Sequence, residues 1–335
     1  MARRKRAAAG DAAFFDRFRS AMARLPTGLI RARPPAEAED VARAEAALGR
    51  PLPETFASFL RSFDGADLFH ESVLIAGVGA GAPRLLTELG QDHPDELVFA
   101  EALSGDRYAI DGAGRVLRHD PDAEERALAG TSFERWLDAT VAREQILFGP
   151  DGEYAPDVFD PAGQEIVPTI ALRQAERALK LDPGAADAEH ARGLALARLG
   201  RRDAALAAFR AATELDADNP WPWFDLGRTA LALEKPAVAL PAFRQAAAGA
   251  SEGPTAARLL AWAVRAAANA DDEKAVAKLR AEAIARDPQL VDGLKHAASS
   301  AGEDADEEAR EEAVALLEAV APGTPVPRRL PVVRH

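Results

Sequence analysis

Two different rhythms of apolar and polar residues divide the chain. Before about residue 147, short apolar runs are mixed with helical patterns, whereas from residue 169 onward apolar residues recur every three or four positions. Alanine also becomes much denser after residue 150, and alanine both favours helices and lets them approach closely. The sequence therefore predicts a mixed front domain followed by an all-helical region.

The front domain begins with two predicted helices in quick succession. Residues 36–49 have a helical apolar period that stops at Gly49. Residues 53–65 begin at a proline, end at a glycine and place apolar side chains at the i, i+3, i+4 and i+7 positions of a helix. Those side chains are Phe56, Phe59, Leu60 and Phe63.

Three apolar runs predict β-strands in the rest of the front domain. They cover residues 72–78, 96–103 and 106–120, and the last run folds back on itself at a glycine turn. Residues 131–148 return to a helical period, with Thr131 or Ser132 as the N-cap. The front domain is therefore expected to contain both helices and strands.

The helical region repeats itself with a period of 34 residues. The recurring positions hold small residues and one aromatic: Gly193 and Gly227, Ala205 and Ala239, Phe209 and Phe243, and Ala178, Ala212 and Ala246. Small residues let paired helices approach, and the aromatic fills the space toward the next pair. The pattern resembles the tetratricopeptide repeat (TPR), a stack of helical hairpins.

Two copies of this repeat fit well, over residues 186–219 and 220–253. A third copy, whose length has drifted, covers 254–288. A final pair of helices, over 289–300 and 307–320, is expected to cap the stack with acidic residues on its outer face.

The composition between these patterns predicts the domain boundaries. Four prolines and three glycines interrupt the segment between the two regions too often for a regular element. The predicted parts are a basic arm and N-terminal helix at 1–25, the front domain at 26–147, a linker at 148–168, the TPR-like solenoid at 169–321 and a disordered tail at 322–335.

The front domain resembles the SUKH superfamily, which includes the Smi/Knr regulators of fungi and many bacterial immunity proteins. The resemblance covers about residues 30–147 and rests on the helix-loop-helix and on the closing helix. The matching residues are Glu45, Leu48, Leu52, Pro53, Phe59, Leu60, Gly65 and Trp136. The resemblance implies an α+β fold, with helices on a mostly antiparallel curved sheet, in which these residues are mainly structural. It also implies binding to other proteins rather than catalysis.

The charge balance narrows the class of partner. The formal net charge is −13, so the field of the whole chain repels nucleic acid and anionic membranes and favours a basic protein. No apolar run is long enough to span a membrane. The basic cluster Arg3 to Arg6 could touch nucleic acid, but a solvated terminal arm is the simpler interpretation.

Candidate chemistry for catalysis or for a metal is scarce. The chain has no cysteine, which excludes disulfides and thiolate ligands. Charged residues interrupt the stretch where a signal peptide would need its apolar segment, so a cytoplasmic location is expected. No two of the six histidines have the spacing of a helical metal site. His119 with Asp120 could form an acid–base pair with a distant carboxylate, but a surface turn is the favoured interpretation. We predict no catalytic residue, no metal and no cofactor.

One glycine turn leaves an enzymatic alternative open. Gly77, Gly79 and Ala82 follow a predicted strand, and Glu101 comes some twenty residues later, as a dinucleotide-binding fingerprint would require. The preceding elements are helices, however, and little helix follows to present amides to a phosphate. A flexible turn is the alternative interpretation.

The expected partner-binding surface is the groove of the solenoid. The first helix of each hairpin lines such a groove, and in the family it holds peptides or partner helices. The predicted groove residues are Asp187, His190 and Leu194 in the first copy and Trp221, Phe224, Arg228 and Leu231 in the second. Trp223 falls instead on a core position of the repeat.

These observations lead to a non-enzymatic binding protein that couples a SUKH-like domain to a TPR scaffold. One hypothesis is an immunity protein whose acidic front domain neutralises a basic toxin. The alternative is a regulatory or structural adaptor that assembles complexes through the TPR groove. A nucleotide-binding enzyme that uses the 77–82 turn is a third possibility.

Overall fold

The fold comes from a computed structural model that describes residues 13–90, 94–120, 125–250, 253–299 and 307–325. The chain forms two compact units, Met1–Leu199 and Gly200–His335. The parts outside the described residues include the basic arm at Arg3 to Arg6, His93, residues 303–306 at the start of the acidic run, and the end of the predicted tail. The division between the units falls between two helices of the helical region.

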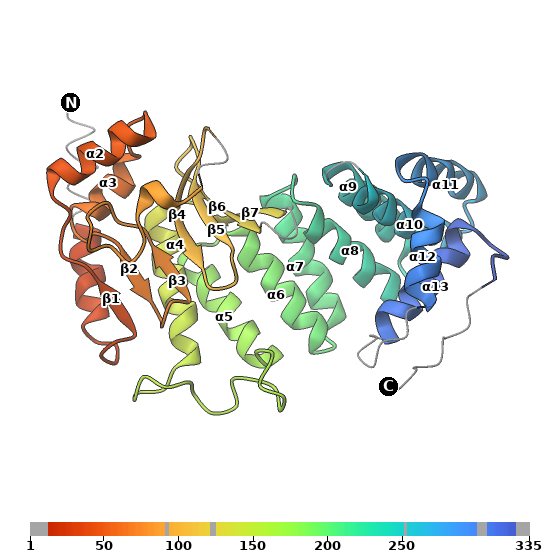
Figure 1. The fold of residues 1–335 in the computed structure, drawn as a ribbon. Helices are drawn as coiled ribbons and strands as arrows, with labels where there is room; N and C mark the ends of the chain where they lie inside the picture. The colour runs from red at the N-terminus through yellow and green to blue at the C-terminus, as the bar shows by residue number, and fades with distance from the viewer. Residues whose placement is uncertain (1–12, 91–93, 121–124, 251–252, 300–306, 326–335) are drawn as a thin grey trace, which may run out of the picture. The chain divides into compact units, whose positions relative to one another are not determined.

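The first unit is built on one antiparallel sheet of seven strands, in which each strand pairs with the next along the chain (Figure 1). The strands are β1 (Ile30–Ala32), β2 (Ala66–Leu68), β3 (Val73–Ile75), β4 (Leu97–Ala102), β5 (Arg107–Ile110), β6 (Val116–Asp120) and β7 (Glu125–Gly130). The helices beside them are α2 (Ala38–Leu48), α3 (Glu54–Leu60) and α4 (Phe133–Glu144), with short 3₁₀ turns at Leu86–Glu88 and Gln145–Leu147.

An aromatic core joins these helices to the sheet. Phe59 of α3 lies 5.4 Å from Phe133 of α4, measured between ring centroids. Phe99 of β4 lies 5.0 Å from Trp136 of α4 in an edge-to-face arrangement. Such pairs add to the free energy gained from burying the rings. A helix over residues 13–22 adds Phe15, which is fully buried in the same core.

The segment between the sheet domain and the helical region has local structure of its own. Isolated β-bridges pair Phe148 with Tyr154 and Phe159 with Ile166. The ring of Phe148 stacks on Tyr154 with centroids 4.8 Å apart. The prolines and glycines of this segment are therefore compatible with tight turns held by aromatic contacts.

The helical region consists of antiparallel helices in sequence. The first unit contains α5 (Pro168–Leu181) and α6 (Ala186–Arg198). The second contains α7 (Arg202–Leu215), α8 (Pro220–Ala232), α9 (Pro236–Gly249), α10 (Pro254–Asn269), α11 (Glu273–Arg286), α12 (Leu290–Ser299) and α13 (Glu307–Val320). Several of them begin with proline at the first helical position, where its missing N–H is not needed.

The hairpin of α8 and α9 shows why the repeat needs a small residue. A Cβ added to Gly227 of α8 would lie 2.7 Å from the ring of Phe243 of α9, far inside van der Waals contact. Phe243 and Ala239 are themselves fully buried. The glycine and the aromatic of the repeat therefore form one close helix crossing.

The predicted fold class is confirmed: an α+β front domain precedes a run of helical hairpins. Strands β3 to β6 lie in the predicted apolar runs, whereas β1, β2 and β7 were not predicted. The second predicted helix is shorter than expected, because α3 ends at Leu60. Gly65 belongs instead to the turn into β2 and has a φ of 83°.

Replacing Gly227 with Ala tests the close crossing. The added methyl group overpacks Phe243, so the variant should lose about 1–3 kcal/mol of unfolding free energy. Gly293 of α12 is a matched control, because a Cβ there meets nothing within 4 Å. Gly293→Ala should gain up to about 1 kcal/mol from helix propensity. Urea denaturation followed by far-UV circular dichroism measures both, and a shift in the same direction for both would contradict this account.

Candidate binding surfaces

The predicted groove residues of the second copy lie together on one face of α8. Trp221, Phe224, Arg228 and Leu231 recur at helical spacing, and each is partly exposed. The rings of Trp221 and Phe224 meet edge to face with centroids 6.1 Å apart. Trp223 faces elsewhere, since its Nε1–H donates to the carbonyl of Ala217 at 3.0 Å.

Helix α10 supplies the other half of this face. The ring of Trp262 lies 5.8 Å from Phe224 and 5.4 Å from Phe243, so it continues the aromatic row of α8 and α9. The Arg228 guanidinium lies 5.8 Å from the Trp262 ring, and that of Arg265 lies 5.1 Å from it. We call Trp221, Phe224, Arg228 and Leu231 of α8, together with Trp262 and Arg265 of α10, the α8–α10 face. Cation–π contacts hold its two arginines against one indole.

The predicted groove residues of the first copy have different surroundings. Asp187 and His190 of α6 lie inside the first unit, where His190 is 8% exposed. Asp187 accepts a hydrogen bond from Arg118 of β6 at 3.2 Å. Leu194 remains 41% exposed on the same helix. The sheet domain therefore occupies the position of Asp187, and His190 is buried beside it on α6.

Arg118 is the centre of a half-buried ionic cluster. Besides Asp187, it pairs with Asp106 at 3.0 Å and with Glu125 at 3.1 Å. All four side chains are less than 20% exposed. The Arg118 guanidinium of β6 thus links Asp106, just before β5, and Glu125, at the start of β7, to the first turn of α6. We call Arg118, Asp106, Glu125 and Asp187 the Arg118 cluster.

The cluster shifts the pKa of its members. Burial by itself would raise the pKa of Asp187, but the guanidinium groups of Arg118 and Arg143 outweigh it and hold this pKa below its ordinary value. Burial also raises the pKa of Tyr108, a shift that the neighbouring Arg143 partly offsets. Asp187 is therefore ionised at neutral pH and attracts both arginines.

A second contact joins the same elements. Asp182 ends α5 and is fully buried. Its carboxylate accepts hydrogen bonds from the backbone N–H of Thr131 at 2.6 Å and from the Thr131 hydroxyl at 2.7 Å. Arg135 lies 3.7 Å from the same carboxylate. Helices α5 and α6 are therefore attached to the sheet domain by charge-assisted bonds at two places.

The amides of Gly77, Val78 and Gly79 in the glycine turn are already hydrogen-bonded within the protein. The Asp64 carboxylate accepts from the backbone N–H of Val78 at 2.7 Å and from that of Gly79 at 3.0 Å. The N–H of Gly77 donates to the carbonyl of Arg84 at 2.9 Å. A phosphate would have to displace a protein carboxylate from the same donors, so the turn serves to close the fold around Asp64.

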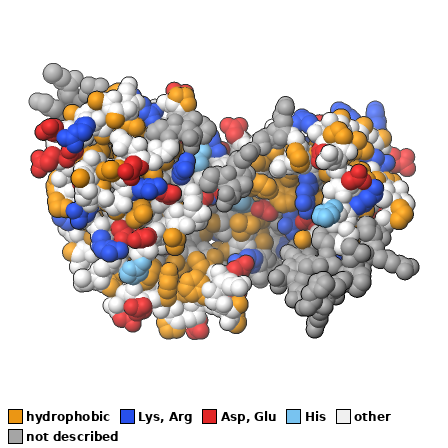
Figure 2. Space-filling view, viewed as in Figure 1, with side chains coloured by type: hydrophobic (Ala, Val, Ile, Leu, Met, Phe, Trp, Pro, Cys, Tyr) orange, Lys and Arg blue, Asp and Glu red, His pale blue; other side chains and the backbone are white. Residues whose placement is uncertain are grey.

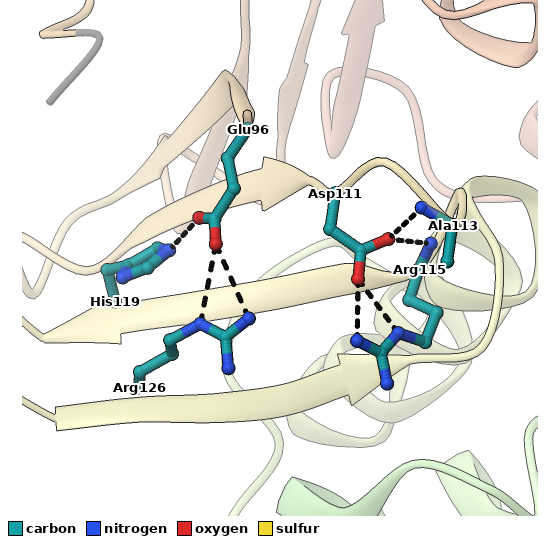
Figure 3. Close-up of polar contacts among 6 residues, drawn as sticks. All are labelled: Glu96, Asp111, Ala113, Arg115, His119 and Arg126. Atoms are coloured by element: carbon teal, nitrogen blue, oxygen red, sulfur yellow. Dashed lines mark hydrogen bonds and ion pairs between the residues drawn. The ribbon is translucent and has the colours of Figure 1, made fainter. Parts of the chain in front are cut away.

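His119 does meet a distant carboxylate, but within a structural trio (Figure 3). Its Nε2 lies 2.6 Å from Oε2 of Glu96, whose other oxygen lies 3.4 Å from Arg126. Asp111 in the same view caps the β5–β6 turn through the amides of Ala113 and Arg115. Over the described parts of the chain, no group of three or more acidic or histidine side chains could hold a metal.

Comparison with known families finds one match in the front domain and one in the helical region. Residues 35–139 match the model of the SMI1 / KNR4 family (SUKH-1), and residues 186–219 match that of the tetratricopeptide repeat. The chain carries a SUKH-1 domain followed by a TPR. A search of curated proteins gave no match.

Several solved structures are similar to the helical region. A MamA double mutant, "MamA RS-1 ArsTM", is 22% identical with a TM-score of 0.33, over 45% of this chain and 84% of that one. MamA 41-end from Desulfovibrio magneticus RS-1 is 22% identical with a TM-score of 0.32, over 45% and 85%. YrrB, described as a TPR protein with an unusual peptide-binding site, is 24% identical with a TM-score of 0.33, over 46% and 76%.

The motif residues of the SUKH-1 domain have structural surroundings. The Glu45 carboxylate accepts from the backbone N–H of Leu52 at 2.9 Å, which fixes the loop between α2 and α3. Pro53 is the N-cap of α3. A Cβ on Gly65 would lie 2.8 Å from the carbonyl oxygen of Ile75. The other motif residues are in or against the core: Leu48, Leu52, Phe59, Leu60 and Trp136.

Sequence reasoning missed the residues that join the SUKH-1 domain to α5 and α6. Thr131 and Asp182 are 51 positions apart, and Arg118 and Asp187 are 69 apart. Asp182 stands out in the sequence only because it recurs with the repeat at Asp216. Trp262 and Arg265 were missed as well, although they stand 34 positions after Arg228 and Leu231 and the period of the repeat is the signal that finds them.

Asp187→Asn tests the Arg118 cluster. The variant should lose about 1–3 kcal/mol of unfolding free energy at neutral pH, because the partly buried guanidinium of Arg118 loses one of its three carboxylate partners. The contribution of Asp187 is complete above its unfolded pKa and is lost as the pH falls through its lowered folded pKa. The difference from wild type should therefore shrink in acid. Thermal denaturation across this pH range measures it.

Asp203→Asn is the matched control, because Asp203 pairs with Lys235 on the surface and is 80% exposed. It should change stability by less than about 0.5 kcal/mol at any pH. Equal stability of the two variants at neutral pH would show that the Arg118 cluster does not hold α6.

Proposed function

We propose that this protein is a non-enzymatic adaptor that binds a protein partner on the α8–α10 face. A SUKH-1 domain together with a TPR indicates a role in protein interactions. The proposal adds which surface binds the partner and which part of the chain holds the first helices in place. We propose no catalytic residue and no cofactor, and we keep the cytoplasmic location inferred from the sequence as part of the proposal.

One observation carries this proposal: aromatic rings and an arginine line one side of α8 without being sealed in the core. Trp221, Phe224 and Arg228 are partly exposed, while Leu226 on the opposite side is buried. Tryptophan and arginine dominate the binding energy of protein interfaces, because they combine a large contact area with directed polar groups.

The surroundings of α6 support a platform role for the SUKH-1 domain. The Arg118 cluster and Asp182 attach α5 and α6 to this domain, so the first hairpin helices cannot move independently of it. Asp187 and His190 are used in this attachment. We therefore assign the partner to the second unit and the anchoring of the helical array to the first.

Immunity to a basic toxin is the second candidate. The net charge of −13 favours steered association with a basic protein. On the face seen in Figure 2, acidic and basic side chains are interspersed across the described surface. The acidity is therefore a property of the whole chain, and no single acidic patch on this face marks a toxin site.

Co-expression with the products of neighbouring genes tests the adaptor proposal. The full chain with Trp221→Ala and Leu231→Ala should bind its partner at least about tenfold more weakly, because an interface loses its apolar anchors. Arg244→Ala, on an exposed position of α9, should bind like the wild type. Calorimetry on the purified complex measures the affinity.

The same experiment separates the two candidates. If the affinity of the complex is unchanged by the α8 substitutions but falls steeply with added salt, the result contradicts the adaptor proposal and favours the immunity alternative. A complex that depends on Trp221 and Leu231 contradicts binding through the SUKH-1 domain alone.

A further inference from the structure

The charge of the α8–α10 face is opposite to that of the chain. Helix α10 has two charged residues, Arg258 and Arg265, and no acidic one, although acidic residues outnumber basic residues 54 to 41 overall. With Trp262, these arginines occupy the i, i+4 and i+7 positions and so share one side of the helix. Arg228 of α8 reaches the same indole ring.

Arg258 shows how this side of α10 binds an anion. Glu312 of α13 pairs with it at 2.9 Å, and the glutamate side chain is only 18% exposed. Within the described residues, no carboxylate pairs in this way with Arg265, one turn beyond Trp262. The Arg265 guanidinium lies over the indole ring, and because its side chain is partly exposed and carries five N–H donors, it can still donate to an incoming anion.

The indole of Trp262 is a third donor at the same place. The ring is 6% exposed, and its Nε1–H has no hydrogen-bond partner among the described residues. A buried donor without an acceptor costs free energy that an incoming acceptor restores. Two guanidinium groups within 6 Å of this ring make an anionic acceptor the matching chemistry.

We propose that the α8–α10 face binds an acidic peptide segment of the partner protein, with a carboxylate at Arg265 and Trp262. The proposal rests on the proposed function and specifies its ligand. Phe224 and Trp221 offer apolar contact beside the arginines, so the segment carries apolar residues next to its acidic ones. Because exposed charges are screened beyond about 8 Å at physiological salt, the local arginines outweigh the distant acidic surface.

Selection from a displayed library of random short peptides on the full chain tests this inference. Enriched peptides should contain more Asp and Glu than the library. Synthetic copies labelled with fluorescein should bind, and copies with Asn and Gln in place of Asp and Glu should bind about tenfold or more weakly. Fluorescence polarisation measures each affinity.

Variants of the full chain assign the contact. Arg265→Gln should weaken binding of the acidic peptide about tenfold, and Arg265→Lys should restore part of it by returning the charge. Trp262→Phe keeps an aromatic ring and removes the N–H, so it should weaken binding severalfold. Arg244→Gln on α9 is the control and should change nothing. Circular dichroism verifies that each variant is folded.

Three results would overturn the inference. Enriched peptides that are neutral or basic, and whose binding is lost with Trp221→Ala, would leave the adaptor function standing and refute the acidic ligand. A failure to enrich peptides, or binding that ignores every substitution on this face, would refute both. Tighter binding of a fluorescein-labelled single-stranded oligonucleotide, with the same dependence on Arg265, would replace the peptide by nucleic acid.

Discussion

The partly buried charge of Arg118 constrains the first unit more than any other group. A guanidinium removed from water is costly unless carboxylates surround it, and here Asp106, Glu125 and Asp187 do so. Two of them come from the sheet domain and one from α6. Satisfying this charge therefore requires the SUKH-1 domain and the first helices of the array to fold as one body. This requirement removes Asp187 and His190 from the set available to a partner.

The elements that the sequence predicted are those in which a period extends over several turns. The helices predicted at 36–49, 289–300 and 307–320 have such a period, and α2, α12 and α13 begin and end within two residues of those bounds. β1 and β2 have three residues each, too few for an alternation to appear. The end of α3 was placed at Gly65, because a glycine after an apolar period resembles a helix stop. The close approach of β3 explains that glycine instead.

The period of the repeat also predicted part of the candidate surface. The register of the 34-residue repeat placed Trp221, Phe224 and Arg228 on one face, and the structure has them there. The same period places Trp262 34 positions after Arg228 and Arg265 34 positions after Leu231, but the groove prediction covered only the first two copies, so these residues were not connected to α8. The attachment of α6 could not be foreseen, because ion pairs between residues 69 positions apart leave no local pattern.

The total charge of this chain and the charge at its candidate surface lead to opposite expectations about a partner. A net charge of −13 governs the long-range field and hence the rate of encounter. Binding at contact depends instead on groups within about one Debye length, which is ~8 Å at physiological salt. At Trp262 those groups include two arginines and an indole N–H. An acidic segment would approach such a face slowly but bind it through several donors, so that the stability of the complex would come from slow dissociation rather than from fast association.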